Sequence, residues 1–251
     1  MYYTDQLNTY KLITNEEVFI ADRVWDYVKK YKLKHILDIG TGNGQIMSYL
    51  KQKEPELIID GVDPIQPENS NCFETFFCQK FEEFEFKKKY DLILFSHVFG
   101  HFEKPHSKLL CKTIGHSDHV IIVTNAVVKD FEIIQKAIWN YVSDFNYYIE
   151  LKSLLKPVSN KNINIHKFEL ELFSSNRNKF YRLLEIFSPR NLPKSPPRIL
   201  ESKIISLFNE SSYRLLIPQF LIEINLTKTK TKVITQLNTH QQFWDYAKKI
   251  Y

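Results

Sequence analysis

The sequence predicts an α/β fold built on a doubly wound, mostly parallel β-sheet. Three observations lead to this prediction. A short apolar strand at residues 35–39 runs into a cluster of glycines and then into a helix-forming segment. A second strand, residues 57–62, follows that helix and ends at Asp63. Strand and helix signals continue to alternate to about residue 125, which is typical of parallel strands covered by helices on both faces.

The first strand leads into a turn that contains three of the six glycines in the chain: Gly40, Gly42 and Gly44. Glycine adopts positive φ without strain and lets the backbone approach a ligand closely. The helix that follows, residues 45–52, would begin with free N–H groups directed at a polar or anionic ligand. Asp63, at the end of the second strand, is placed to accept hydrogen bonds from ribose hydroxyls. We therefore expect a nucleotide-type ligand at this turn.

The glycine spacing discriminates among ligands. The dinucleotide fingerprint is G-x-G-x-x-G/A, but this chain has Gln45 where that pattern requires glycine or alanine. NAD and FAD are therefore disfavoured, and a turn that is only structural stays open as an alternative. The pattern D-x-G-x-G-x-G, from Asp38 to Gly44, resembles motif I of the class I S-adenosylmethionine (SAM) dependent methyltransferases.

This resemblance covers residues 15–125 and implies SAM as the cofactor, with S-adenosylhomocysteine (SAH) as its product. In that family the glycine turn passes the methionine part of the cofactor. The first carboxylate, here Asp38, helps to hold the cofactor amine, and the second, here Asp63, binds the ribose. Pro64, which begins the following loop, is assigned to the same site. The resemblance also implies seven strands with an antiparallel edge.

The elements around the turn fit the same scheme. Apolar residues at helical spacing over 15–31 predict a helix before the first strand. Residues 76–78 predict a third strand, which leads into Gln79. Members of the resembled family commonly carry Asp or Asn there, in contact with the adenine amino group, and Gln79 could make the same bond. Phe81 is expected either on the adenine face or in the core.

The fourth strand is predicted at residues 90–95 and continues into the sequence SHVFGHF. The whole string resembles the fourth strand and following loop of small-molecule methyltransferases, where these residues line the transfer site. Ser96 is therefore assigned to the cofactor site, and His97 and His101 are the catalytic candidates. If the segment is helical, these two histidines share a face, and each could take a proton from a nucleophile near neutral pH. A structural role stays open, and no metal site is predicted because no third ligand stands nearby.

A helix at 108–114 and a fifth strand at 119–123 complete the predicted core. The rest is interpreted as acceptor-side structure within one domain spanning 1–251. Its predicted elements are a long helix at 129–155, strands at 163–173 and 215–226, a mainly helical insertion at about 174–214 and a terminal helix at 235–251. Residues 1–14 are interpreted as a surface strap or part of a lid.

Composition limits the function classes. At 251 residues and 43% hydrophobic composition, the chain can bury a substantial core. Three cysteines in no metal-type or disulfide pattern indicate a reducing cytoplasm, and no apolar run is long enough to span a bilayer. The net charge of +5 comes from interspersed charges, so nucleic acid is not a favoured partner. The oligomeric state is left open.

The favoured function is transfer of a methyl group from SAM to nitrogen or oxygen of a small molecule. One alternative is a methyltransferase that acts on RNA or protein, although neither an Asn-Pro-Pro-Tyr-like loop nor a Pro-Cys pair is present. A second alternative is a SAM-binding subunit without turnover. The intact D-x-G-x-G-x-G pattern and Asp63 count against that alternative.

Overall fold

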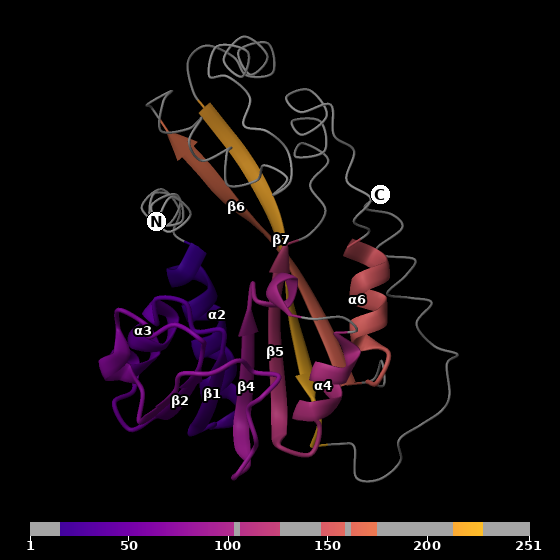
Figure 1. Ribbon diagram of the computed structural model, residues 1–251. Helices are drawn as coiled ribbons and strands as arrows, with labels where there is room; N and C mark the ends of the chain where they lie inside the picture. Colours follow the sequence, from indigo (N-terminus) through magenta and orange to yellow (C-terminus); the bar gives the residue numbers. More distant parts are fainter. Residues whose placement is uncertain (1–15, 103–105, 126–146, 159–161, 175–212, 228–251) are drawn as a thin grey trace. The chain divides into compact units, whose positions relative to one another are not determined.

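The computed structural model describes residues 16–102, 106–125, 147–158, 162–174 and 213–227 (Figure 1). Their helices are α2 (Glu16–Tyr31), α3 (Gln45–Lys53), η1 (Ser70–Cys72), η2 (Phe99–His101), α4 (Ser107–Thr113) and α6 (Tyr147–Leu155). Their strands are β1 (His35–Ile39), β2 (Ile58–Val62), β3 (Thr75–Phe77), β4 (Tyr90–Ser96), β5 (Ser117–Asn125), β6 (Ile163–Ser174) and β7 (Tyr213–Asn225).

The strands form one seven-stranded sheet in the order β3-β2-β1-β4-β5-β7-β6. The pairs β1–β2, β1–β4, β2–β3 and β4–β5 are all parallel. The arrows in Figure 1 show β7 running against its neighbours β5 and β6. The predicted doubly wound sheet with an antiparallel edge is therefore confirmed. Its strand order reverses between β1 and β4, where ligands bind in open α/β sheets.

The central strands are buried on both faces, as their sequences require. The four residues Leu92–Phe95 of β4 and the four residues Val120–Val123 of β5 are fully buried. Near-continuous apolar runs of this kind are typical of parallel strands covered by helices. Helix α2 contributes a buried stripe at helical spacing: Ile20, Ala21, Val24, Tyr27 and Val28. The packed core thus fixes the positions of the strands whose ends carry the candidate site.

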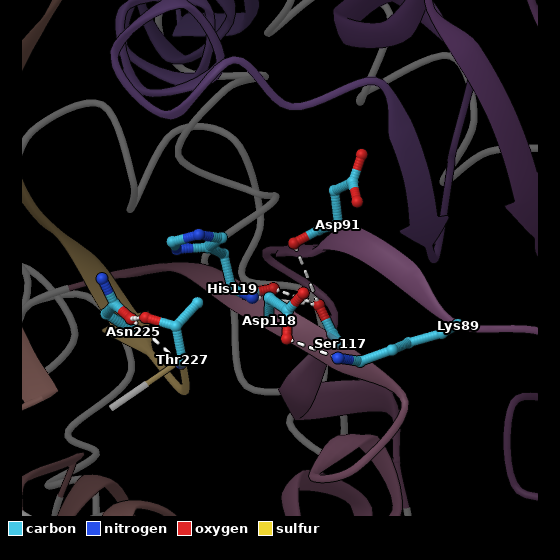
Figure 2. A network of polar contacts seen from close by, with 7 residues as sticks. All are labelled: Lys89, Asp91, Ser117, Asp118, His119, Asn225 and Thr227. Atoms are coloured by element: carbon cyan, nitrogen blue, oxygen red, sulfur yellow. Dashed lines mark hydrogen bonds and ion pairs between the residues drawn. The ribbon is translucent and has the colours of Figure 1, made fainter. Parts of the chain in front are cut away.

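Polar contacts align β4 and β5 at their amino ends (Figure 2). The Ser117 hydroxyl lies between these strands and donates to the backbone carbonyl of Asp91 at 3.4 Å. Asp118 forms an ion pair with Lys89, which lies just before β4. Buried His119 reaches α2, with its Nδ1 atom 2.9 Å from the Tyr27 hydroxyl. Burial lowers the pKa of His119, so its neutral form belongs to this contact.

The chain divides into two compact units. The larger comprises Ile20–Thr124, Tyr147–His166 and Phe220–Tyr251, and the smaller comprises Met1–Phe19, Asn125–Asn146 and Lys167–Gln219. Within the smaller unit, the fully buried Gln219 amide donates to the carboxylate of Glu16. The rings of Phe19 and Phe168 stack there at a centroid distance of 4.8 Å.

Several predicted segments lie outside the described residues. These are the arm at 1–14, the first part of the helix at 129–155, nearly all of the insertion at 174–214 and the helix at 235–251. The last part of the helix predicted at 129–155 is present as α6. Among the described helices, none is both long enough and apolar enough to cross a membrane.

Candidate cofactor site

The loop that follows β4 packs against the glycine turn that follows β1. Gly40 has a φ of 73°, and its N–H donates to the Val62 carbonyl at the end of β2 at 2.8 Å. A Cβ atom on Gly40 would lie 2.4 Å from Cγ2 of Val98, in the loop after β4. Gly40 is therefore required for two reasons: positive φ and direct packing of the turn against that loop.

The far side of the turn is held by the loop that follows β2. Gly44, at a φ of 76°, caps α3, and a Cβ there would lie 2.9 Å from the Asn69 carbonyl oxygen. The backbone and side-chain N–H groups of Asn69 both donate to the Asn43 carbonyl, at 3.0 and 2.9 Å. The Cys72 thiol donates to the Asn69 carbonyl at 3.0 Å. Sequence reasoning missed this support because the loop carries no periodic signal.

Asp38 lies buried beneath the turn. Its side chain is 3% exposed, and in the sheet it pairs with Gly61 of β2. A Cβ on Gly61 would lie 2.9 Å from both Phe73 and the Thr41 methyl, so the site is tightly packed. Burial, with a further contribution from Asp63, raises the pKa of Asp38 to about 8. Within the described residues, its carboxylate accepts no hydrogen bond, and the buried Thr41 hydroxyl has no partner.

Asp63 faces the same turn from the end of β2. One carboxylate oxygen accepts the Gly42 N–H at 3.2 Å, and the other accepts the Ile65 N–H at 2.9 Å. The side chain stays half-exposed, and Pro64 beside it is exposed. The structure thus brings Asp38, Asp63 and the three glycines together, as the sequence predicted. A carboxylate oriented by two backbone N–H groups retains further lone pairs for a ligand.

The residues after β3 occupy two different environments. Gln79 is half-buried and directly follows the strand end, with its N–H donating to the Phe77 carbonyl at 2.9 Å. Phe81 is only 2% exposed and lies in an aromatic cluster with Phe84, Phe86, Phe95 and Phe102. This places the Phe81 ring in the core, one of the two environments expected for it.

The loop after β4 is not a continuous helix. β4 ends at Ser96, and His97 adopts a left-handed φ of 54° before the short helix η2, which ends at His101. The shared helical face considered for the two histidines is therefore absent. The His97 N–H donates to the Val123 carbonyl of β5 at 2.9 Å, which fixes the bend. His97 is half-buried, whereas His101 is exposed.

The arrangement favours a cationic, hydroxyl-bearing ligand over a phosphate. Two carboxylates border the turn, and one of them already accepts the Gly42 N–H. A pyrophosphate placed there would meet the carboxylate of Asp63, whereas an ammonium group would find an acceptor in Asp38, which can ionise to pair with it. Among the described residues, no group of three or more His, Cys, Asp or Glu side chains could hold a metal ion.

Comparisons with known proteins bear on the same segment. Residues 15–138 match a family model described as a methyltransferase domain. No curated protein matches the sequence. The solved structure of the plantazolicin methyltransferase BpumL, in complex with a monoazolic desmethylPZN analog and SAH, is 20% identical over 89% of this chain and 88% of that one, with a TM-score of 0.49. Magnesium protoporphyrin IX methyltransferase from Synechocystis PCC 6803, with bound SAH, is 13% identical over 82% of each chain, with a TM-score of 0.49.

Proposed function

We propose that the methyltransferase domain of residues 15–138 transfers the methyl group of SAM to a nitrogen or oxygen atom of a small-molecule acceptor. One observation carries the choice of cofactor. Asp38 is a buried carboxylate without a hydrogen-bond donor among the described residues, and it lies beneath a glycine turn that a second carboxylate borders. SAM has an ammonium group for the first carboxylate and ribose hydroxyls for the second, and it has no phosphate.

Each site residue then has a separate role in binding. Asp38 accepts from the ammonium group of the methionine part, and the buried Thr41 hydroxyl offers a further polar contact beside it. The glycines allow the backbone to approach the cofactor, and Asp63 with Pro64 receives the ribose. Gln79, at the end of β3, bonds to the base, and Phe81 supports the Gln79 segment from the core. Ser96 borders the site at the end of β4.

The bound cofactor supplies a methyl group on a sulfonium ion. The protein has to align the attacking atom with that methyl group and exclude water. His97 and His101 flank the bend after β4, at the edge where parallel strands present ligands. Either imidazole can take the proton that a hydroxyl or ammonium acceptor must lose. The left-handed backbone of His97 is a strained conformation of the kind found at functional sites.

Ligand binding tests this proposal. Calorimetry is performed with SAH and with NAD, on the unmodified chain and on Asp63→Ala. Asp26→Ala, which changes an exposed carboxylate on α2, is the matched control. We expect SAH to bind, NAD to show no binding, and Asp63→Ala to weaken SAH binding by about 1.5–3 kcal/mol, the size of lost bonds to a charged group. Binding of NAD alone, or no binding of SAH, would refute the proposal.

Methyl transfer is then measured with a panel of small amines and hydroxyl compounds, beside RNA and protein substrates. Release of SAH with a small acceptor supports the proposed class. Transfer to RNA or protein alone would show that the acceptor is that macromolecule and not a small molecule. SAH binding without transfer to any member of the panel would leave a cofactor-binding protein without turnover.

A further inference from the structure

Lys112, in helix α4, contacts the segment that follows β3. Its ammonium group donates to the backbone carbonyls of Phe81 and Glu82, at 2.8 and 2.9 Å. It also lies 4.9 Å from the centroid of the Phe81 ring. These contacts join residues about thirty positions apart in the sequence. Through these contacts, one side chain of α4 binds the backbone of the residues that follow Gln79.

The contacted segment, residues 79–84, is a compact turn with its own backbone hydrogen bonds. The Glu83 N–H donates to the Lys80 carbonyl and the Phe84 N–H to the Phe81 carbonyl, both at 3.1 Å, while the Gln79 N–H donates to the Phe77 carbonyl at 2.9 Å. The Phe81 and Glu82 carbonyls lie near the end of this turn, and a cation that bonds to carbonyls in such a place stabilises that end. Lys112 bonds to both of them, in addition to the Phe84 N–H that the Phe81 carbonyl accepts.

Lys112 is well matched to this task. Burial lowers the pKa of its ammonium group, while the carboxylates of Glu82 and Glu85 act in the opposite direction. A partly buried ammonium group loses hydration, so its bonds to carbonyls and its contact with the aromatic face become stronger than they are in water. Lys108, one turn earlier on α4, is exposed.

We propose that Lys112 is a positioning residue that holds the 79–84 turn in the conformation in which Gln79 binds the base of the cofactor. This inference rests on the proposed function, which places adenine beside Gln79. The aromatic cluster around Phe81 fixes the inner side of the turn, and Lys112 fixes its backbone. Without Lys112 the turn keeps its buried rings, but Gln79 loses its fixed orientation.

The test compares two ligands on four proteins. The ligands are SAH and its analogue in which hypoxanthine replaces adenine, so that the exocyclic amino group is absent. The proteins are the unmodified chain, Lys112→Met, which keeps length but cannot donate, Lys112→Arg, which restores donors, and Lys108→Met as the control on the same helix. Calorimetry gives the dissociation constants, and thermal unfolding confirms that each variant is folded.

We expect Lys112→Met to weaken SAH binding by about 10-fold and to lose most of the preference for adenine over hypoxanthine. Lys112→Arg and Lys108→Met should keep both the affinity and the preference. A loss of stability alone would not remove the preference for one base. Folded Lys112→Met that keeps the SAH affinity and the base preference of the unmodified chain would overturn the inference.

Hydrogen exchange provides a second measurement that does not depend on Lys112→Met being folded. In the unmodified chain, SAH should increase protection of amides within 79–84, and Lys112→Arg should show the same increase. No added protection in the unmodified chain with SAH bound would overturn the inference while leaving the proposed function intact. Failure of the unmodified chain to bind SAH would instead refute the proposed function, and the inference with it.

Discussion

Raising the pH from 6 to 8 is expected to tighten SAH binding, because Asp38 changes its protonation state over this range. Its pKa in the free protein is about 8, owing to burial and to the neighbouring Asp63. About 1% of Asp38 is therefore ionised at pH 6, about 10% at pH 7 and about half at pH 8. Only the ionised carboxylate can pair with the ammonium group of SAH, which stays protonated throughout this range.

The size of the effect follows from these fractions. When a ligand requires one form, its apparent affinity is reduced by the fraction of protein in that form, so the dissociation constant should fall about 10-fold from pH 6 to 7 and about 50-fold from pH 6 to 8. Ionising Asp38 costs about 1.4 kcal/mol at pH 7, which the ammonium group must offset. Binding at pH 7 should accordingly release close to one proton.

Calorimetry measures both quantities, the affinity directly and the released proton from the dependence of the binding heat on the ionisation enthalpy of the buffer. Asp38→Asn is the control. The asparagine side chain has nearly the same shape as aspartate but cannot ionise, and all the histidines of the chain are left in place. In that variant affinity should be low at pH 8 and nearly independent of pH. If the unmodified protein binds SAH equally well at pH 6 and 8 and releases no proton, the assigned role of Asp38 is wrong.

Three further predictions concern packing, catalysis and acid stability. Gly40→Ala should lower the free energy of unfolding by about 2–4 kcal/mol, from strain at positive φ and overlap with Val98. In urea titrations the double variant with Val98→Ala should lose less than the sum of the single losses, and strict additivity would argue against the overlap. His97→Asn or His101→Asn should slow methyl transfer by about 100-fold with little change in SAH affinity, and full rates in both would exclude an acid–base role. Because burial depresses the pKa of His119, the stability associated with its neutral form is present above about pH 6.5 and is lost as the pH falls through its folded value. Urea unfolding at pH 7.5 and 5 should therefore show a larger loss for the unmodified chain than for His119→Gln, and equal losses would contradict this assignment.

Local signals in the sequence were sufficient to predict the strands, the glycine turn and the two neighbouring carboxyl groups of the candidate site. The apolar run of β1, the three glycines and the second carboxylate each lie within a short stretch. Parallel strands bring their carboxyl ends to one edge, so the approach of Asp38 to Asp63 follows from the strand assignments alone. The backbone angles of the glycines follow equally directly, since positive φ is what a clustered set of glycines most often provides.

The bend after β4 could not be predicted in the same way. The four-residue spacing of His97 and His101 fits a helix, but the chain adopts a left-handed turn at His97 instead. That turn depends on a hydrogen bond to Val123 in the neighbouring strand β5 and on the packing of Val98 against Gly40. Both partners are distant in sequence, and periodicity within one segment carries no information about them.

The sequence by itself therefore determined the order of the elements, the parallel sheet and the carboxylates and glycines at its edge, because these depend on local periodicity and on residue chemistry. Only the tertiary structure decided the environment of each group. It buried Asp38 without a donor among the described residues, placed the Phe81 ring in the aromatic core and brought Lys112 to the carbonyls of the 79–84 turn. The physical reason is that burial and electrostatics depend on which distant segments pack together, and only the folded chain specifies that packing.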